Sequence, residues 1–299
     1  MQTHFLPFSV IQTVLSKARY NSAIAGTAHR LERPYTARPH QSIREATHTS
    51  QYQDTFKRVE KKYLLRREQY IELRRALDGH MVCDRFGLHT VCNVYFDTPD
   101  YALIRRSLEK PVYKEKLRMR SYGVPGPGDQ VFLEIKKKYK GVVYKRRVAL
   151  TLEEGARFMR TCALSEDDFR LRSAVEGQIA REINWFERIH CARPRAYIAY
   201  DRVALFAPDT PDLRVTFDSA IRWRGDRLWL DSPTLGKSVL PEDRVLMEIK
   251  IPGALPLWLS HELTGLGIFP TTFSKYGACY RRFIADKGAA LMKGCDYSA

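Results

Sequence analysis

Short stretches in which apolar and polar residues alternate dominate the chain from residue 56 to residue 251. This period of two is typical of β-strands that have one apolar and one polar face. It predicts eight strands, at residues 56–65, 90–97, 112–121, 131–138, 142–150, 197–206, 213–221 and 244–251. A helical period of apolar positions predicts helices at residues 67–79, 152–163, 175–190 and 273–287. The pattern therefore predicts an α+β fold, an antiparallel β-barrel of about eight strands with peripheral helices.

Both ends of the chain differ from this central part. Residues 1–50 are rich in Ser, Thr, Arg and His, with only Glu32 and Glu45 acidic, and they show no sustained period. We expect a flexible extension at 1–50, one domain at 51–290 and a short tail at 291–299. No apolar run approaches the ~18 residues of a membrane span, so we expect a soluble, cytoplasmic protein.

Charged residues in the predicted strands recur at every second position. Residues two apart in a strand project to the same side of the sheet. In 114–120, four cations therefore share one face, while Leu117 and Met119 share the other. The same arithmetic places further charges together on single faces of other strands. These are Arg58, Glu60 and Lys62; Glu134 and Lys136; Lys145 and Arg147; and Glu248 and Lys250, with Arg202 and Arg214 in the middle of their strands.

The composition indicates which kind of partner these charged faces suit. The chain has 50 Lys and Arg against 34 Asp and Glu, a net charge of +16, yet 44% of its residues are hydrophobic. Such a chain can build a core, and its excess charge indicates a polyanionic partner. An ordinary solvated sheet face would explain one such strand. For a set of strands we favour a water-filled tunnel that holds a phosphate chain, with the few carboxylates holding a divalent metal, Mn²⁺ or Mg²⁺.

Eight segments resemble the polyphosphate polymerase domain of the vacuolar transporter chaperone (VTC) complex and its bacterial relatives. That family is related to the CYTH, or triphosphate tunnel, metalloenzymes. The resemblance runs from about residue 56 to residue 283. It rests on RVEKKYLL (58–65), VYFDTPDY (94–101), KEKLRMRSYG (114–123), FLEIKKKYKGVVYKRR (132–147), YDRVALF (200–206), LRVTFD (213–218), MEIKIPG (247–253) and FSKYG (273–277).

The resemblance implies an antiparallel β tunnel in which the γ-phosphate of ATP is transferred to a growing polyphosphate chain with the help of a divalent metal. It implies a metal ligand at Glu248, with Glu60 and Glu134 as either metal support or partners of tunnel cations. The implied catalytic cations are Lys62, Arg118, Arg120, Lys136 and Lys275. The implied substrate-binding residues are Arg58, Lys145, Arg147, Arg202, Arg214, Lys250 and Ser274.

The chain departs from the wider tunnel pattern at two places. The general signature begins E-x-E-x-K, whereas Arg58 stands here at the position of the first Glu. This departure disfavours a two-metal triphosphatase or an adenylyl cyclase. Residues 1–50 are also too few for the inositol-phosphate-sensing SPX domain that often precedes the eukaryotic polymerases.

Two alternative functions remain open. A tunnel triphosphatase or polyphosphatase would hydrolyse the same substrates, and a non-catalytic module would only bind polyphosphate or RNA. We expect ATP and inorganic polyphosphate as partners and no nucleic acid. RNA readers interleave aromatic residues for stacking, whereas Tyr95, Phe96 and Phe132 are predicted at apolar strand positions. Relatives in fungi work within membrane complexes, so the resemblance also allows a membrane partner protein. The sequence does not define the oligomeric state.

Overall fold

The computed structural model describes residues 58–285, which belong to the unit Lys57–Ala299. All eight predicted strands are present, with ends that differ from the prediction by a few residues. They are β1 (Arg58–Arg66), β3 (His89–Asp97), β4 (Tyr113–Tyr122), β5 (Gln130–Tyr139), β6 (Val142–Thr151), β7 (Arg193–Ala207), β8 (Thr210–Arg224) and β10 (Arg244–Pro252). The predicted extension at 1–50 and tail at 291–299 lie outside the described residues.

Three very short strands were not predicted: β2 (Val82–Cys83), β9 (Lys237–Ser238) and β11 (Pro270–Thr271). Two residues are too few to show alternation, so only pairing with a neighbour identifies them. With these additions the described residues form one antiparallel sheet of 11 strands, in the order β11-β1-β10-β8-β7-β3-β4-β5-β6. Strand β2 pairs with β7, and β9 pairs with β8.

This strand order corrects the prediction of a closed barrel of about eight strands. In the part of the chain that the structure describes, β11 and β6 are the two ends of the order and do not pair with each other. Alternation shows where strands begin and end, but it carries no information about which strand pairs with which. The α+β class and the antiparallel sheet are confirmed, and the sheet is open.

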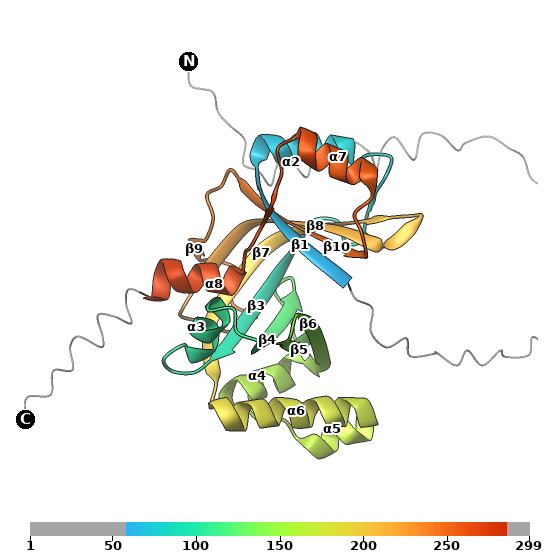
Figure 1. Ribbon diagram of the computed structural model, residues 1–299. Helices are drawn as coiled ribbons and strands as arrows, with labels where there is room; N and C mark the ends of the chain where they lie inside the picture. The colour runs from blue at the N-terminus through green and yellow to red at the C-terminus, as the bar shows by residue number, and fades with distance from the viewer. Residues whose placement is uncertain (1–57, 286–299) are drawn as a thin grey trace, which may run out of the picture. The chain divides into compact units, whose positions relative to one another are not determined.

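The helices lie at the periphery of the sheet (Figure 1). Four predicted helices are confirmed: α2 (Arg67–Ala76), α4 (Leu152–Thr161), α6 (Ala174–His190) and α8 (Lys275–Cys279), which continues into the π-helical turn η1 (Tyr280–Ile284). Three shorter helices were not predicted: α3 (Ala102–Leu108), α5 (Glu166–Arg172) and α7 (Leu257–Gly265). Helices α5 and α6 pack together, as do α2 and α7. No helix within residues 58–285 is both long and apolar enough to cross a membrane.

The apolar faces of the strands form the core. Leu117 and Met119 of β4 are 0% and 2% exposed, and they belong to a cluster that includes residues of α4 and α6. Helix α4 approaches the sheet closely at Gly155, where an added Cβ would lie 2.7 Å from Val131 Cγ2. Because this face of β4 and β5 is covered by helices, the alternating charged residues face the opposite side of the sheet.

Candidate phosphate-binding face

The register of the strands brings the predicted charged residues onto one face of the sheet. Lys62 of β1 lies opposite Glu248 of β10, and Arg118 of β4 lies opposite Glu134 of β5. We call this surface the charged face. By strand position it includes Glu60 and Lys62 of β1; Glu248 and Lys250 of β10; Arg214 and Asp218 of β8; Arg202 of β7; Lys116, Arg118 and Arg120 of β4; Glu134 and Lys136 of β5; and Lys145 and Arg147 of β6.

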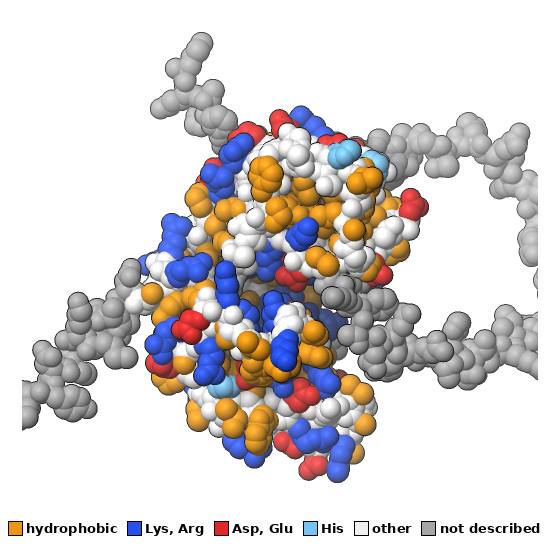
Figure 2. Space-filling view, viewed as in Figure 1, with side chains coloured by type: hydrophobic (Ala, Val, Ile, Leu, Met, Phe, Trp, Pro, Cys, Tyr) orange, Lys and Arg blue, Asp and Glu red, His pale blue; other side chains and the backbone are white. Residues whose placement is uncertain are grey.

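The sheet curves so that its two flanks approach each other across the charged face. Lys136 lies on β5, five strands away from β10 in the strand order. Its pKa is lowered first by desolvation, and it is also altered by the charges of Glu60, Lys62 and Glu248 on β1 and β10. Lys136 nevertheless stays accessible to solvent. Figure 2 shows a recess in this side of the molecule with Lys and Arg side chains around it.

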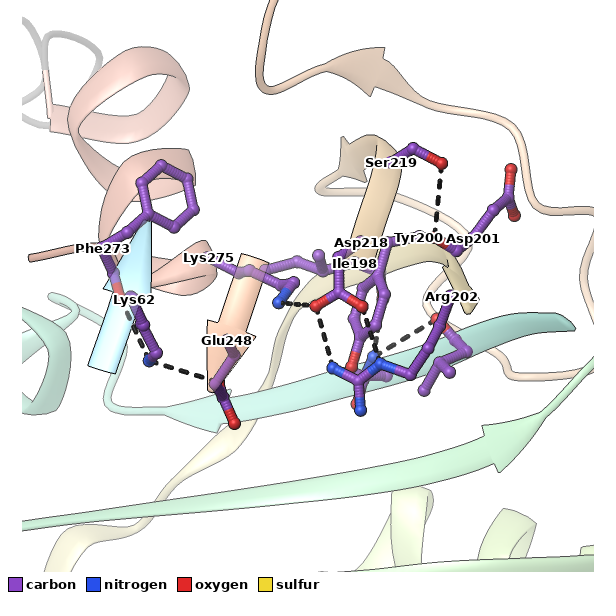
Figure 3. A network of polar contacts seen from close by, with 12 residues as sticks. Lys62, Ile198, Tyr200, Asp201, Arg202, Asp218, Ser219, Glu248, Phe273 and Lys275 are labelled. Atoms are coloured by element: carbon purple, nitrogen blue, oxygen red, sulfur yellow. Dashed lines mark hydrogen bonds and ion pairs between the residues drawn. The ribbon is translucent and has the colours of Figure 1, made fainter. Parts of the chain in front are cut away.

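Three consecutive residues before and at the start of α8 connect the two flanks. Lys62 of β1 donates to the carbonyl oxygen of Phe273 over 3.2 Å, and Lys116 of β4 donates to Ser274 Oγ over 3.3 Å. Lys275 Nζ donates to Asp218 Oδ2 of β8 over 2.5 Å (Figure 3). The segment 273–275 therefore spans the charged face without adding a strand to the sheet.

Two carboxylates and two lysines form the first cluster on this face. Lys62 Nζ lies 3.1 Å from Glu60 and 3.8 Å from Glu248, and Lys250 Nζ lies 2.7 Å from Glu248. Desolvation opposes ionisation of Glu248, but Lys250, Lys62 and Lys275 outweigh it and lower its pKa to about 2. Glu248 is therefore a fixed negative charge at neutral pH.

Glu134 is the centre of a second cluster. Its carboxylate accepts from Arg118 Nε over 2.7 Å, and it lies 3.9 Å from Arg120 and 3.2 Å from Lys145. Burial opposes ionisation, but these three cations lower its pKa to about 2. The structure thus gives Glu134 cationic partners, the second of its two predicted roles. Glu134 holds Arg118 through only some of the five N–H donors of its guanidinium, so other donors remain for a ligand.

Asp218 was missed as a site residue by the sequence analysis. It is 1% exposed, and it accepts from Arg202 at 2.6 and 2.8 Å as well as from Lys275 (Figure 3). Burial opposes ionisation of Asp218, and the two cations outweigh it and hold its pKa well below the usual range. The signal was available, since Asp218 lies two and four positions from residues on the charged face of β8.

Lys116 was recognised as part of the charged strand face but was not assigned a role. Its pKa is lowered to about 7, first by desolvation and then by Lys114, Lys136, Lys62 and Arg118. Among the described residues no carboxylate forms an ion pair with Lys116. The charge of this lysine therefore depends on what binds beside it.

Tyr200 is a second residue that the sequence analysis missed. The ring lies 4.3 Å from Lys275 Nζ, and its hydroxyl accepts from Arg120 over 3.4 Å. Desolvation opposes ionisation, but Arg120, Arg202 and Lys275 together lower the pKa of Tyr200 to about 8. Tyr200 therefore lies among three cations of the site, Arg120, Arg202 and Lys275.

The remaining predicted residues lie at the margins of the charged face. Arg214 is exposed and donates to the carbonyl oxygen of Pro211. Arg147 is also exposed, and its guanidinium lies 4.8 Å from the ring centroid of Phe132. Arg58 begins β1 opposite Pro252, and its side chain is outside what the structure describes.

The three aromatic residues predicted at apolar strand positions differ in their surroundings. Tyr95 and Phe96 are both buried in the core, at 7% and 2% exposed, and Arg118 donates to the Tyr95 hydroxyl over 3.2 Å. Phe132 is only partly buried and lies on the charged face, where Arg147 packs over its ring. Tyr95 and Phe132 serve as partners of arginines here, a pairing that strand alternation alone does not indicate.

The carboxylates suit a metal that arrives with phosphate rather than a metal held by protein alone. Within residues 58–285 no three His, Cys, Asp or Glu side chains come together to hold an ion. Glu248 and Glu60 both approach Lys62, so they lie beside the same point of the charged face. Mg²⁺ is commonly bound by one or two carboxylates together with substrate phosphates. The donor set fits that arrangement.

Cations outnumber carboxylates on the charged face, and several have no acidic partner. Lys116, Lys136 and Arg147 form no ion pair with any described residue. Three of its arginines, Arg118, Arg120 and Arg202, are held in place by Glu134 and Asp218. The fold and the site define a protein whose open antiparallel sheet presents a strongly cationic face.

Residues 57–284 match the VTC domain, and the chain belongs to this family. No curated protein matches the sequence. Three solved structures resemble the fold at TM-scores below one half. A candidate adenylate cyclase from Bacillus halodurans has a TM-score of 0.44 at 14% identity, covering 75% of this chain and 96% of its own. A candidate adenylate cyclase from Vibrio parahaemolyticus has a TM-score of 0.36 at 10% identity, covering 74% of this chain and 96% of its own. A chain of the Mediator head module of Schizosaccharomyces pombe has a TM-score of 0.35 at 9% identity, covering 76% of this chain and 95% of its own.

Proposed function

We propose that this protein is a metal-dependent polyphosphate polymerase that transfers the γ-phosphate of ATP to the end of an inorganic polyphosphate chain. One observation carries the proposal: the unpaired cations Lys116, Lys136 and Arg147 share one face with the carboxylate of Glu248. A surface that only bound polyanions would gain nothing from a fixed negative charge beside Lys62 and Lys250. Membership of the VTC domain family supports the same activity.

The reaction needs no nucleophile from the protein. A terminal oxygen of the polyphosphate chain attacks the γ-phosphorus of ATP, the bond from that phosphorus to the β,γ-bridging oxygen breaks, and ADP leaves with the electron pair. Catalysis of such a transfer consists mainly of positioning and charge stabilisation. The chain supplies donors on and beside the charged face, namely Lys62, Arg118, Arg120, Lys136 and Lys275.

The residues divide into two groups by their proposed role. Lys62 is held by the carbonyl oxygen of Phe273, and Lys275 is held by Asp218. These contacts suit the two lysines to orient the triphosphate of ATP. The cations of β6, β7 and β8 would guide the polymer: Lys145, Arg147, Arg202 and Arg214. Arg147 and Arg214 are exposed at the margins of the charged face, whereas Arg202 shares Asp218 with Lys275 and so lies beside the first group. Lys250 keeps Glu248 ionised, and Ser274 positions Lys116.

A divalent ion, when bound, neutralises charge on the phosphate oxygens as a Lewis acid. Glu248 is the residue best placed to hold it, with Glu60 across Lys62 as a second carboxylate. Glu134 is engaged with Arg118 and Lys145, and its geometry favours the role of holding these cations.

The full chain should be incubated with ATP and either Mn²⁺ or Mg²⁺, and the products resolved by gel electrophoresis and phosphate assay. Long polyphosphate with ADP supports the polymerase. Free phosphate without polymer would instead identify a hydrolase. No turnover, combined with tight binding of polyphosphate, would identify a binding protein, so each outcome selects one function.

Glu248→Gln should reduce metal-dependent synthesis by about a hundredfold or more, because the charge that holds the ion is lost. Glu182→Gln is the matched control, since Glu182 is ion-paired with Lys137 and Arg146 on the opposite face of the sheet. Initial rates at several metal concentrations measure the effect. Full metal-dependent synthesis in Glu248→Gln would show that the assignment of this glutamate is wrong.

A further inference from the structure

The end of the β5–β6 hairpin exposes an apolar cluster that no described element covers. Tyr139 and Val142 flank the two-residue turn at Lys140 and Gly141, where φ is +45° and +88°. In register, Tyr113 of β4 lies beside Tyr139. The exposed apolar residues at this end, which we call the hairpin tip, are Val112 (64% exposed), Tyr113 (43%), Tyr139 (47%), Val142 (43%), Val143 (48%) and Tyr144 (54%).

Lysines surround the hairpin tip. The pKa of Lys114 is lowered first by desolvation and then by Lys138 and Lys110, so these three ammonium groups lie near one another. Lys140 stands at the turn itself, and its Nζ lies 5.5 Å from the ring centroid of Tyr139. Lys110, Lys138 and Lys140 are exposed to solvent.

The acidic residues near the hairpin tip mostly have polar or charged partners. Glu115 accepts from the Tyr113 hydroxyl over 2.8 Å and from His190 over 2.7 Å. Glu182 pairs with Arg146 and Lys137, and Glu109 remains as an exposed carboxylate next to Lys110. The tip therefore combines apolar side chains with a net positive rim.

We propose that the hairpin tip docks the protein onto an anionic lipid bilayer. Tyrosine and aliphatic side chains partition into the boundary between headgroups and acyl chains, and clustered lysines are attracted by anionic headgroups. The exposed apolar side chains project from both faces of the hairpin end, Val142 and Tyr144 from one and Val143 from the other, so a tip inserted into the bilayer would bury all of them. A soluble polyphosphate would account for the lysines but would leave the apolar residues without a role.

A protein partner added to the edge of β6 fits less well. Beyond the tip this edge strand continues with Lys145, Arg146 and Arg147, and charges on an edge strand oppose the pairing of another strand. Two copies of this chain paired along β6 would bring these cations together. An anionic lipid surface would bind both the apolar side chains and the lysines of the hairpin tip. This inference does not depend on the proposed activity.

The test is co-sedimentation of the full chain with vesicles of phosphatidylcholine alone and with vesicles that contain about one third phosphatidylglycerol. The wild-type protein should sediment with the anionic vesicles only. Val142→Ser combined with Tyr144→Ser should lower the bound fraction at least about fivefold, and so should Lys110→Glu combined with Lys140→Glu. Leu257→Ser with Phe269→Ser is the control, since these residues are even more exposed (78% and 69%) but lie elsewhere, and their substitution should change nothing.

Two further measurements separate lipid docking from phosphate binding and from dimer formation. Phosphate transfer without vesicles should be unchanged in every variant, since none of the substituted residues contacts the charged clusters of the site. If soluble polyphosphate displaces the protein and the serine variant binds vesicles like wild type, the lysines bind phosphate alone and the proposal is wrong. Light scattering that shows a dimer lost in the serine variant would also overturn it, as would equal binding to neutral vesicles.

Discussion

Lys136 and Lys137 are identical in chemistry and adjacent in sequence, yet they have opposite surroundings. Lys137 pairs with Glu182 of α6 on the outer side of the sheet, whereas Lys136 has no acidic partner among the described residues and faces Lys116 and Lys145 in register. The difference follows from the period of two along a strand. An unpaired cation among other cations is unfavourable until an anion binds, so Lys136 is suited to a ligand and Lys137 to structure.

Lys136→Ala should therefore reduce polyphosphate synthesis by about tenfold to a thousandfold, the range found when one charge-stabilising donor is removed. Lys137→Ala should change synthesis by less than about twofold and reduce stability only slightly, because it is a partly exposed ion pair. Initial rates and thermal unfolding of both variants measure this contrast. Equal loss of activity in the two would mean that the charged face is not the site.

Lys116 should make the affinity for phosphate chains depend on pH. In the free protein its pKa is about 7, because desolvation and neighbouring cations disfavour the ammonium. A bound polyanion favours the ammonium and raises this pKa, so binding takes up a proton at pH values above about 7. The affinity for a short polyphosphate should fall as pH rises above 7, by up to about tenfold per pH unit.

Lys116→Arg keeps the charge at every pH and should remove most of this dependence while retaining affinity. Isothermal titration in two buffers with different ionisation enthalpies measures the proton uptake directly. A wild-type affinity that does not change between pH 7 and pH 9 would contradict the assignment.

At the scale of elements, the placement of α8 decides whether the two flanks of the sheet act together. Tyr276 is 3% exposed, stacks on Tyr95 with centroids 4.8 Å apart, and donates to Asp97 Oδ2 over 2.9 Å. Asp97 is fully buried and also accepts from the backbone N–H groups of Thr98, Leu103 and Ile104. This network fixes β3, α3 and α8 relative to one another and so sets the position of Lys275.

Tyr276→Phe should leave the fold intact but lower the free energy of unfolding by about 1 to 2 kcal/mol, because Asp97 loses one donor. Synthesis should fall by about tenfold at a temperature where the variant is fully folded, since Lys275 is held less firmly. Tyr280→Phe, on the following turn η1, is the control and should be close to wild type. Circular dichroism and initial rates distinguish the two effects. Unchanged synthesis in a destabilised Tyr276→Phe would give Tyr276 a structural role only.

At the scale of the whole molecule, the excess of cations is concentrated rather than spread evenly. The net charge of +16 indicates only a polyanionic partner. The sheet brings cations from β1, β4, β5, β6, β7, β8 and β10 to one face, while Lys137 of β5 and Arg146 of β6 pair with Glu182 outside it. Because these cations share one face, a strongly cationic surface and a packed apolar core can occur in one sheet.

Most of the strands and the residues of the charged face were predictable, because burial of an apolar face imposes a period of two on each strand. The predictions failed where contacts between distant segments decide the outcome. The short strands β2, β9 and β11 exist only through their neighbours, and the closed barrel was wrong because strand pairing is not encoded in alternation. Phe132 was misplaced because an aromatic residue can pack on an arginine as well as in a core.

The sequence by itself determined the α+β class, the eight long strands, the charged side of each strand and the membership of a family, since all of these follow from local periodicity and motif order. Only the tertiary structure decided that the sheet is open and that residues 273–275 join its flanks. It alone also revealed that Asp218 holds Lys275 and Arg202. These contacts join residues far apart along the chain, and their formation depends on the curvature of the sheet, which no single segment specifies.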